Sequence, residues 1–173
     1  MAKSSDRFSR NPIPNSQFSI LNFCLLIVLS LSVSCGAAPR SSTPTPDPAA
    51  GPSVVLPSGA RYRVEIARTP EEQAQGLMFR EALPEKTGML FPFPEPGVHK
   101  FWMKNTMIPL DMIWMDESGR VLYVSADTPP CKADPCATYG PDSAAKQVLE
   151  IAGGKAKDEK VTSGSTLKIE GVK

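Results

Sequence analysis

Six polar residues lie beside large apolar side chains and are the best candidates for chemistry. They are Arg80, His99, Lys104, Asn105, Thr106 and Asp111. If they converge, they can bind an anionic or hydroxylated ligand, because arginine offers a planar fork of donors and lysine a point charge. The alternative is structural. Arg80 or Lys104 then pairs with Asp111 and holds the loop around Pro109, while Asn105 and Thr106 bond the backbone of that turn.

Catalysis requires a nucleophile or an acid–base pair, held in place by an orienting group. The chain has one histidine, His99, and lacks a Gly-x-Ser-x-Gly elbow, a phosphate loop and a dinucleotide fingerprint. Asp111 and His99 are the candidate acid–base groups. An enzyme that acts on a cell-wall polymer is therefore the alternative to a binding protein.

Methionine suggests a second alternative. Six of the seven methionines fall between positions 78 and 115, namely Met78, Met89, Met103, Met107, Met112 and Met115. Thioether sulfur together with histidine can hold Cu(I). These methionines stand among Phe, Trp, Leu and Ile, which favours gap-filling in a core. We expect no metal and no cofactor.

Cys131 and Cys136 form a closely spaced pair in a Pro-rich segment. Two cysteines five positions apart can reach disulfide distance across a turn that contains proline. A zinc site needs two further ligands, and a redox-active pair more typically has two residues between its cysteines. The pair therefore predicts a structural disulfide, as suits an exported protein.

The periodicity predicts many short strands and few helices between these residues. Residues 61–67 alternate polar and apolar, and Thr69, Pro70 and Glu72 form a helix-start signal with a capping box. Further strands are expected at 89–91, 98–103, 110–115, 121–125, 148–151 and 166–170, with helical turns at 155–160. The pattern indicates an α+β domain over residues 54–173, built on a compact, curved, mainly antiparallel sheet or small barrel with one or two short helices.

The N-terminal 34 residues have the layout of a secretory signal. A polar segment with Lys3, Arg7 and Arg10 precedes a short apolar run, which ends at Ser34-Cys35. This ending resembles a bacterial lipobox, although Ser32 stands where an aliphatic residue is usual. We expect Cys35 to be lipidated and residues 35–53, rich in Pro, Ser and Thr, to tether the domain. An ordinary cleaved signal and an uncleaved anchor are the alternatives.

Export sets the expected location and partners. The chain should face the periplasm or the exterior as a lipoprotein, attached to the membrane through Cys35. Loss of residues 1–34 removes three of the 19 basic and one of the 18 acidic residues, which leaves a net charge of −1. Such a near-neutral domain has no electrostatic footprint for nucleic acid.

Two long motifs resemble a known family. These are Gly76-Leu77-Met78-Phe79-Arg80 and the run from Phe101 to Asp111, followed by Val148–Gly154 and Gly164. They are similar to the bacterial and archaeal family called domain of unknown function 192, over residues 61–171. The resemblance implies a compact β-rich fold. It implies no activity, because the family's biochemical role is unassigned.

Taken together, the residues favour a non-catalytic envelope module that binds a small ligand or an envelope partner. The enzyme and the copper-binding protein stay open as alternatives. The binding module and the enzyme differ in one observable feature. A binding module tolerates burial of the polar candidates in ion pairs, whereas an enzyme needs an exposed cleft that contains a group with a shifted pKa.

Overall fold

The computed structural model describes residues 51–172. The chain divides into two units, Met1–Ser41 and Ser42–Lys173, and all the described residues belong to the second. The signal segment 1–34, the lipidation site Cys35 and the tether up to residue 50 lie outside the described residues. Within residues 51–172, no helix combines the length and the apolar character needed to cross a membrane.

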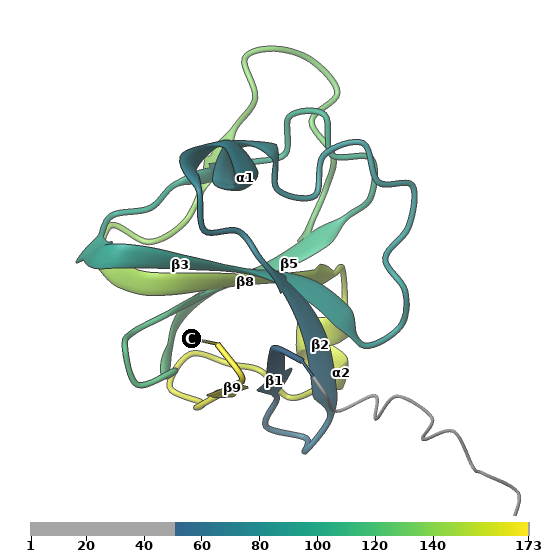
Figure 1. Ribbon diagram of the computed structural model, residues 1–173. Coiled ribbons are helices and arrows are strands. Elements are labelled where there is room, and N and C mark those ends of the chain that lie inside the picture. Colours follow the sequence, from purple (N-terminus) through teal and green to yellow (C-terminus); the bar gives the residue numbers. More distant parts are fainter. Residues whose placement is uncertain (1–50, 173) are drawn as a thin grey trace, which may run out of the picture. The chain divides into compact units, whose positions relative to one another are not determined.

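A seven-stranded mixed sheet forms the body of the domain (Figure 1). Its strands lie in the order β6-β5-β8-β3-β2-β1-β9. They are β1 (Ser53–Val55), β2 (Arg61–Ile66), β3 (Thr87–Gly97), β5 (Leu110–Met115), β6 (Val121–Thr128), β8 (Ala145–Ala152) and β9 (Lys168–Glu170). The pair β2–β3 is parallel and the other pairs are antiparallel, so the predicted α+β fold with a curved, mainly antiparallel sheet is confirmed.

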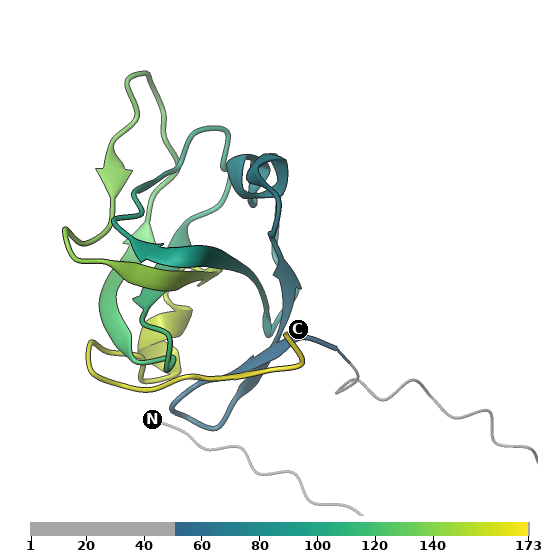
Figure 2. The same cartoon turned by 60° about the vertical axis from the view of Figure 1, so that its left-hand side comes forward.

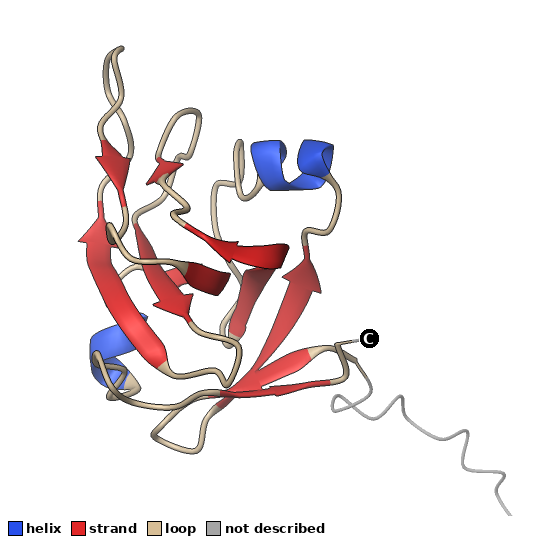
Figure 3. Ribbon diagram, turned by 90° about the vertical axis from the view of Figure 1, so that its left-hand side faces the viewer, coloured by secondary structure: helices blue, strands red, loops and turns tan. Residues whose placement is uncertain are grey.

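Two short helices and a second, two-stranded sheet complete the described part (Figure 3). The helices are α1 (Pro70–Gln75) and α2 (Lys155–Asp158), and the small sheet pairs β4 (Phe101–Trp102) with β7 (Thr138–Tyr139). The strand expected at 98–103 is reduced to the two residues of β4. The strands β1 and β7 were not expected, because segments of two or three residues are too short to show a period.

The central strands are buried on both faces, as the nearly continuous apolar run of β5, interrupted only by Asp111, predicts. Alternate residues of β5 point to opposite sides, so that Ile113 and Met115 join one core and Met112 and Trp114 join the other. The helix α2 lies on the first side, because its Ala156 belongs to the same core as Ile113. The helix α1 lies over the second side (Figure 1).

The start of α1 follows its sequence signal closely. Thr69 is the N-cap, its hydroxyl accepts from the Glu72 backbone N–H at 3.1 Å, and the Glu72 carboxylate accepts from the Thr69 N–H at 3.0 Å. The helix ends at Gly76, whose φ of 49° suits glycine. Leu77 and Met78 follow the helix end, and Leu77 is buried in the core.

Candidate functional site

The disulfide between Cys131 and Cys136 is present, as predicted. Its loop lies at the same end of the domain as α1 (Figures 1 and 2). The Cys131 N–H donates to the Met103 carbonyl at 3.2 Å, and Lys104 Nζ bonds Asp134 Oδ2 at 3.1 Å. The bridged loop therefore supports the turn that follows β4.

Asp111 is fully buried on the α2 side of the sheet, and its carboxylate is used by the backbone. Its Oδ1 accepts from the Asp127 and Gly154 N–H groups at 2.6 and 3.0 Å, and its Oδ2 accepts from the Ala156 N–H at 2.6 Å. Gly154 has a φ of 83° and is the N-cap residue of α2. Asp111 thus joins β5 to the start of α2 and to the end of β6, which is a structural role.

The two cations expected to pair with Asp111 have other partners. Arg80 makes a two-pronged ion pair with Glu65 at 2.5 and 2.7 Å. This hydrogen bonding lowers the pKa of the Glu65 carboxyl and raises the pKa of Arg80. Lys104 pairs with Asp134, and its ammonium lies 5.7 Å from the centre of the Trp102 ring. The predicted pairing of Asp111 with Arg80 or Lys104 is therefore wrong, because backbone amides occupy both carboxylate oxygens.

His99 stacks on Phe93, with ring centres 3.5 Å apart and planes inclined by 10°. Its backbone carbonyl accepts from Trp114 Nε1 at 2.8 Å. Burial lowers the pKa of His99, and a hydrogen bond to the Glu95 backbone opposes this shift. Its buried Nε2 atom has no hydrogen-bond partner among residues 51–172. His99 and Asp111 do not form an acid–base pair, since both Asp111 oxygens bond backbone amides.

Asn105 and Thr106 lie in the turn beside the C-terminal end of α1. The Asn105 carbonyl accepts from the Phe79 N–H at 2.9 Å, and Asn105 Nδ2 lies 3.9 Å from Met78 Sδ. Thr106 is buried and lines a small cavity under this turn. Of the six polar candidates, Thr106 is thus the one whose side chain enters that cavity.

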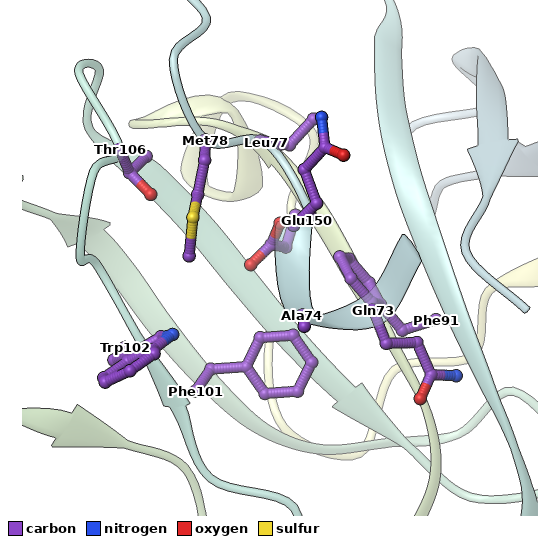
Figure 4. Close-up of a pocket in the computed structure, with 11 residues that line it drawn as sticks. Gln73, Ala74, Leu77, Met78, Phe91, Phe101, Trp102, Thr106 and Glu150 are labelled. Atoms are coloured by element: carbon purple, nitrogen blue, oxygen red, sulfur yellow. The ribbon is translucent and has the colours of Figure 1, made fainter. Parts of the chain in front are cut away.

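The cavity contains a residue that the sequence did not single out, Glu150 of β8. The residue is 5 % exposed, and its side chain points between Met78, Trp102 and Phe101 (Figure 4). The space has a volume of about 30 Å³, enough for one or two water-sized groups. The lining residues are Gln73, Ala74, Gln75, Gly76, Leu77, Met78, Phe91, Phe101, Trp102, Thr106 and Glu150.

The Glu150 carboxyl has no charged or hydrogen-bonding partner in the cavity wall. Glu150 is the one ionisable residue in the lining, and no hydrogen bond or ion pair of its carboxyl is found within residues 51–172. Its neighbours across the strands are apolar, Met89 on β3 and Met112 on β5. Burial raises the pKa of Glu150 from its usual 4.5 to about 8, so the carboxyl is mostly protonated at neutral pH.

Three exposed apolar residues line the cavity or adjoin its lining residues in the chain. Phe79, Trp102 and Met107 are 66, 49 and 54 % exposed, and each either lines the cavity or directly follows a residue that does. Phe79 also has a φ of 62°, an uncommon conformation for a bulky residue. We call Phe79, Trp102 and Met107 the apolar rim. Clustered exposed apolar residues are typical of interaction sites.

A wider groove adjoins the cavity and shares part of its wall. Its volume is about 420 Å³, and Gln73, Ala74, Phe101 and Trp102 line both spaces. Phe93, Val98, His99 and Lys100 line the remainder. His99 therefore lines the groove, while Glu150 lines the smaller cavity beside it.

The methionines are divided between the core and the site. Met115 packs in the α2-side core, whereas Met89, Met103 and Met112 pack in the core under α1. Met78 lines the cavity and Met107 lies on the apolar rim. These positions suit gap-filling. In the described part of the chain, no group of three or more His, Cys, Asp or Glu side chains is arranged to hold a metal ion.

One feature of the sequence could have pointed to Glu150 as a buried acid. Glu150 interrupts the apolar run Val148-Leu149-Glu150-Ile151, which is predicted as a strand. A strand that is buried on both faces must bury any acid within it, and a buried acid without a partner is costly. The sequence does not show that β8 lies centrally between β3 and β5, which is what buries Glu150.

Comparison with known proteins identifies the family. The model of DUF192, described as an uncharacterized ACR, matches residues 54–169. The chain belongs to the DUF192 family. This confirms the resemblance stated above, and the segments that build the Glu150 cavity all fall within the matched DUF192 region.

Two solved structures are similar to this DUF192 protein. A candidate transcription regulator from Sinorhizobium meliloti 1021 shares 31% sequence identity with this chain, with a TM-score of 0.63. The alignment covers 70% of this chain and 93% of the regulator. A protein of unknown function from Novosphingobium aromaticivorans DSM 12444 is 34% identical with a TM-score of 0.61, covering 74% of this chain and 94% of its own. No curated protein matches the chain. These matches assign no molecular function, so a function has to be inferred from the geometry of the site.

Proposed function

We propose that this DUF192 domain is a non-catalytic binding module whose ligand enters the Glu150 cavity and the adjoining groove. One observation carries the proposal. Glu150 is 5 % exposed as a residue, its carboxyl bonds no group in residues 51–172, and this carboxyl faces a cavity. Buried polar groups in folded proteins are nearly always hydrogen-bonded. A bound molecule that satisfies this carboxyl would explain why a glutamate is kept there.

The surroundings of the cavity support binding in two ways. The apolar rim offers contact area to the part of a bound ligand that extends out of the cavity. The rim is also held in place, because Phe79 bonds the Asn105 carbonyl and the disulfide loop bonds Met103. A rigid site loses little conformational entropy when it binds.

A fragment screen on the full chain tests this proposal. With 13C-labelled methionine methyl groups, Met78 reports on the cavity and Met115 reports on the opposite face. Small amines, amides, alcohols and carboxylic acids are added one at a time. We expect at least one class to shift Met78 saturably and leave Met115 unmoved. If no class shifts Met78, or if a hit also binds a chain in which Thr106→Trp fills the cavity, the proposal is wrong.

We also propose that the module is exported and anchored to a membrane through a lipid on Cys35. The sequence layout before Cys35 and the oxidised Cys131–Cys136 pair support this location. Mass spectrometry of the N-terminus should find a diacylglyceryl group on Cys35, and Cys35→Ala should release the chain from membranes. An N-terminus that begins at Met1, or an unmodified Cys35, would contradict the anchor.

An acid–base enzyme is the second candidate, and it now depends on Glu150. A pKa of about 8 is close to the value that a general base or acid needs at neutral pH. The wall adds one hydroxyl, that of Thr106, to this carboxyl. Each fragment that shifts Met78 can be recovered and weighed after prolonged incubation. A new product formed by the parent chain but not by Glu150→Gln would favour the enzyme over the binding module.

A further inference from the structure

The Glu150 cavity has the composition of a site for a positively charged group. Three kinds of lining occur together, namely a carboxyl at the base, aromatic rings of Phe91, Phe101 and Trp102 in the wall, and the Met78 thioether above. Aromatic faces attract cations, and a carboxylate pairs with them. An ammonium group can use both at once.

We propose that the cavity receives the side-chain ammonium of a lysine in an extended peptide or protein segment. This inference rests on the proposed function, since it names the ligand of the same site. The ammonium would bond the Glu150 carboxylate and lie against the aromatic wall. The aliphatic stem would pass the apolar rim, and the flanking backbone would lie along the adjoining groove.

Size supports this occupant. The cavity, at about 30 Å³, accepts a group the size of one or two waters, which matches an ammonium and its last methylene. The guanidinium of arginine is larger and planar. The groove, at about 420 Å³, is far larger than the cavity, so a free ammonium ion would leave it empty.

Charge supports the occupant as well. Several elements pack against Glu150, and every residue that they place beside it is uncharged. These residues are Met89 on β3, Met112 on β5, Gln73 and Ala74 on α1, Leu77 and Met78 after it, Phe101 and Trp102 on β4, and Thr106. Lys104 stands over Trp102, but its ammonium pairs with Asp134. No described cation therefore occupies the place that the ligand would take.

The acid gains its missing partner when the lysine binds. An ammonium ion beside Glu150 favours the ionised carboxylate, which lowers the pKa from its raised value of about 8. Binding near neutral pH must then release one proton from the protein. A neutral ligand that accepts a hydrogen bond from the protonated carboxyl has the opposite pH dependence, so the two are separable.

The experiment uses the full chain with 13C-labelled methionine methyl groups and four probes. Nα-acetyl-lysine N-methylamide carries the complete group, and its ε-acetylated form removes the charge. Nα-acetyl-norleucine N-methylamide removes the ammonium, and n-butylamine removes the backbone. Affinity is read from the Met78 signal, with Met115 as the internal control.

We expect the lysine probe to bind at least tenfold more tightly than the acetylated or norleucine probe. Glu150→Gln should weaken the lysine probe at least tenfold and leave the norleucine probe unchanged. The matched control Glu117→Gln, the same substitution on an exposed turn, should alter neither. Between pH 6 and pH 8 the lysine affinity should rise about 50-fold, and it should fall again above the ammonium pKa of about 10.4.

Three results would overturn the assignment. Equal binding of the lysine and acetylated probes, or affinity that falls between pH 6 and pH 9, would show that a neutral group is bound, while the binding site itself would stand. Equal binding of n-butylamine and the lysine probe would show that the peptide backbone contributes nothing. The cavity would then be a site for amines in general. A fragment screen without any hit defeats the proposed function itself, so the failures are distinguishable. An unchanged Met115 signal in Glu150→Gln shows that the variant is folded.

Discussion

Asp111 and Glu150 lie on adjacent central strands, where Asp111 is opposite Ile151 and Met112 is opposite Glu150. Both residues are buried, at 0 and 5 % exposure, but their side chains leave the sheet on opposite faces. Three backbone N–H groups satisfy Asp111, whereas no described residue satisfies Glu150. Burial alone therefore does not tell a structural acid from a ligand-binding one; the presence of fixed donors does.

The difference arises from what covers each face. On the α2 side, the chain returns after β8 and presents the N–H groups of Gly154 and Ala156 to Asp111. On the other side, Glu150 meets side chains from α1 and β4, and a cavity remains between them. A carboxylate surrounded by donors stabilises a fold, while one left without donors destabilises it at a pH where it ionises.

The largest effect is expected from Asp111→Ala. The change leaves three N–H groups without an acceptor, that of Ala156 buried and those of Asp127 and Gly154 partly buried, and a buried unsatisfied group costs about 1–3 kcal/mol. We expect a loss of about 5 kcal/mol, much of the roughly 5–15 kcal/mol available to a domain. Urea unfolding measures it. A loss below about 1 kcal/mol would mean that the two carboxyl groups are not different in kind.

The second effect is a pH dependence that comes from Glu150. Its pKa is about 8 in the folded chain and near 4.5 when unfolded, so the folded chain holds a proton that the unfolded chain has lost. Stability should therefore fall as pH rises from about 4.5 to about 8, by on the order of 3–4 kcal/mol. Glu150→Gln should remove this slope and should be the more stable chain at pH 9.

The two chains are compared by thermal melts at half-unit steps between pH 5 and pH 9. Subtracting one curve from the other cancels the titration of every other group. A flat difference would show that Glu150 has a partner or reaches solvent, and the contrast with Asp111 would be lost.

A smaller effect is expected from Asp111→Asn, which sharpens the comparison. The amide oxygen can still accept from the Asp127 and Gly154 N–H groups, but the amide nitrogen then faces the Ala156 N–H, so two donors meet. We expect a loss of about 2 kcal/mol. Amide exchange at Ala156 should rise more than at Asp127. Equal losses for the asparagine and alanine variants would mean that charge, not hydrogen-bond geometry, is what matters.

The smallest effects are expected from the cations. Lys104→Ala breaks a partly exposed pair with Asp134, and Arg80→Ala breaks the pair with Glu65. Exposed ion pairs contribute about 0–1 kcal/mol each. Both variants should therefore melt close to the parent chain. A drop as large as that of Asp111→Ala would revive the idea that these cations support a buried acid.

Local features of the fold could be predicted from the sequence because their causes lie within a few residues. The capping box at Thr69 and Glu72, the alternation of β2, and the apolar run of β5 are of this kind. The turn after β5 is another, since Asp116 accepts from the Ser118 and Arg120 N–H groups. The Cys131–Cys136 disulfide joins positions five apart, and it too was predictable.

The roles of the two acids depend on residues that are distant in the chain. Asp111 bonds residues 16, 43 and 45 positions away, so no local pattern connects them. The Glu150 cavity combines segments 73–78 and 101–106 with β8. The sequence by itself therefore determined most of the longer elements, the family motifs and the mostly antiparallel β-rich class. The tertiary structure alone decided which face each acid occupies, because strand order and the chain's return after β8 determine where donors are present and where a cavity is left.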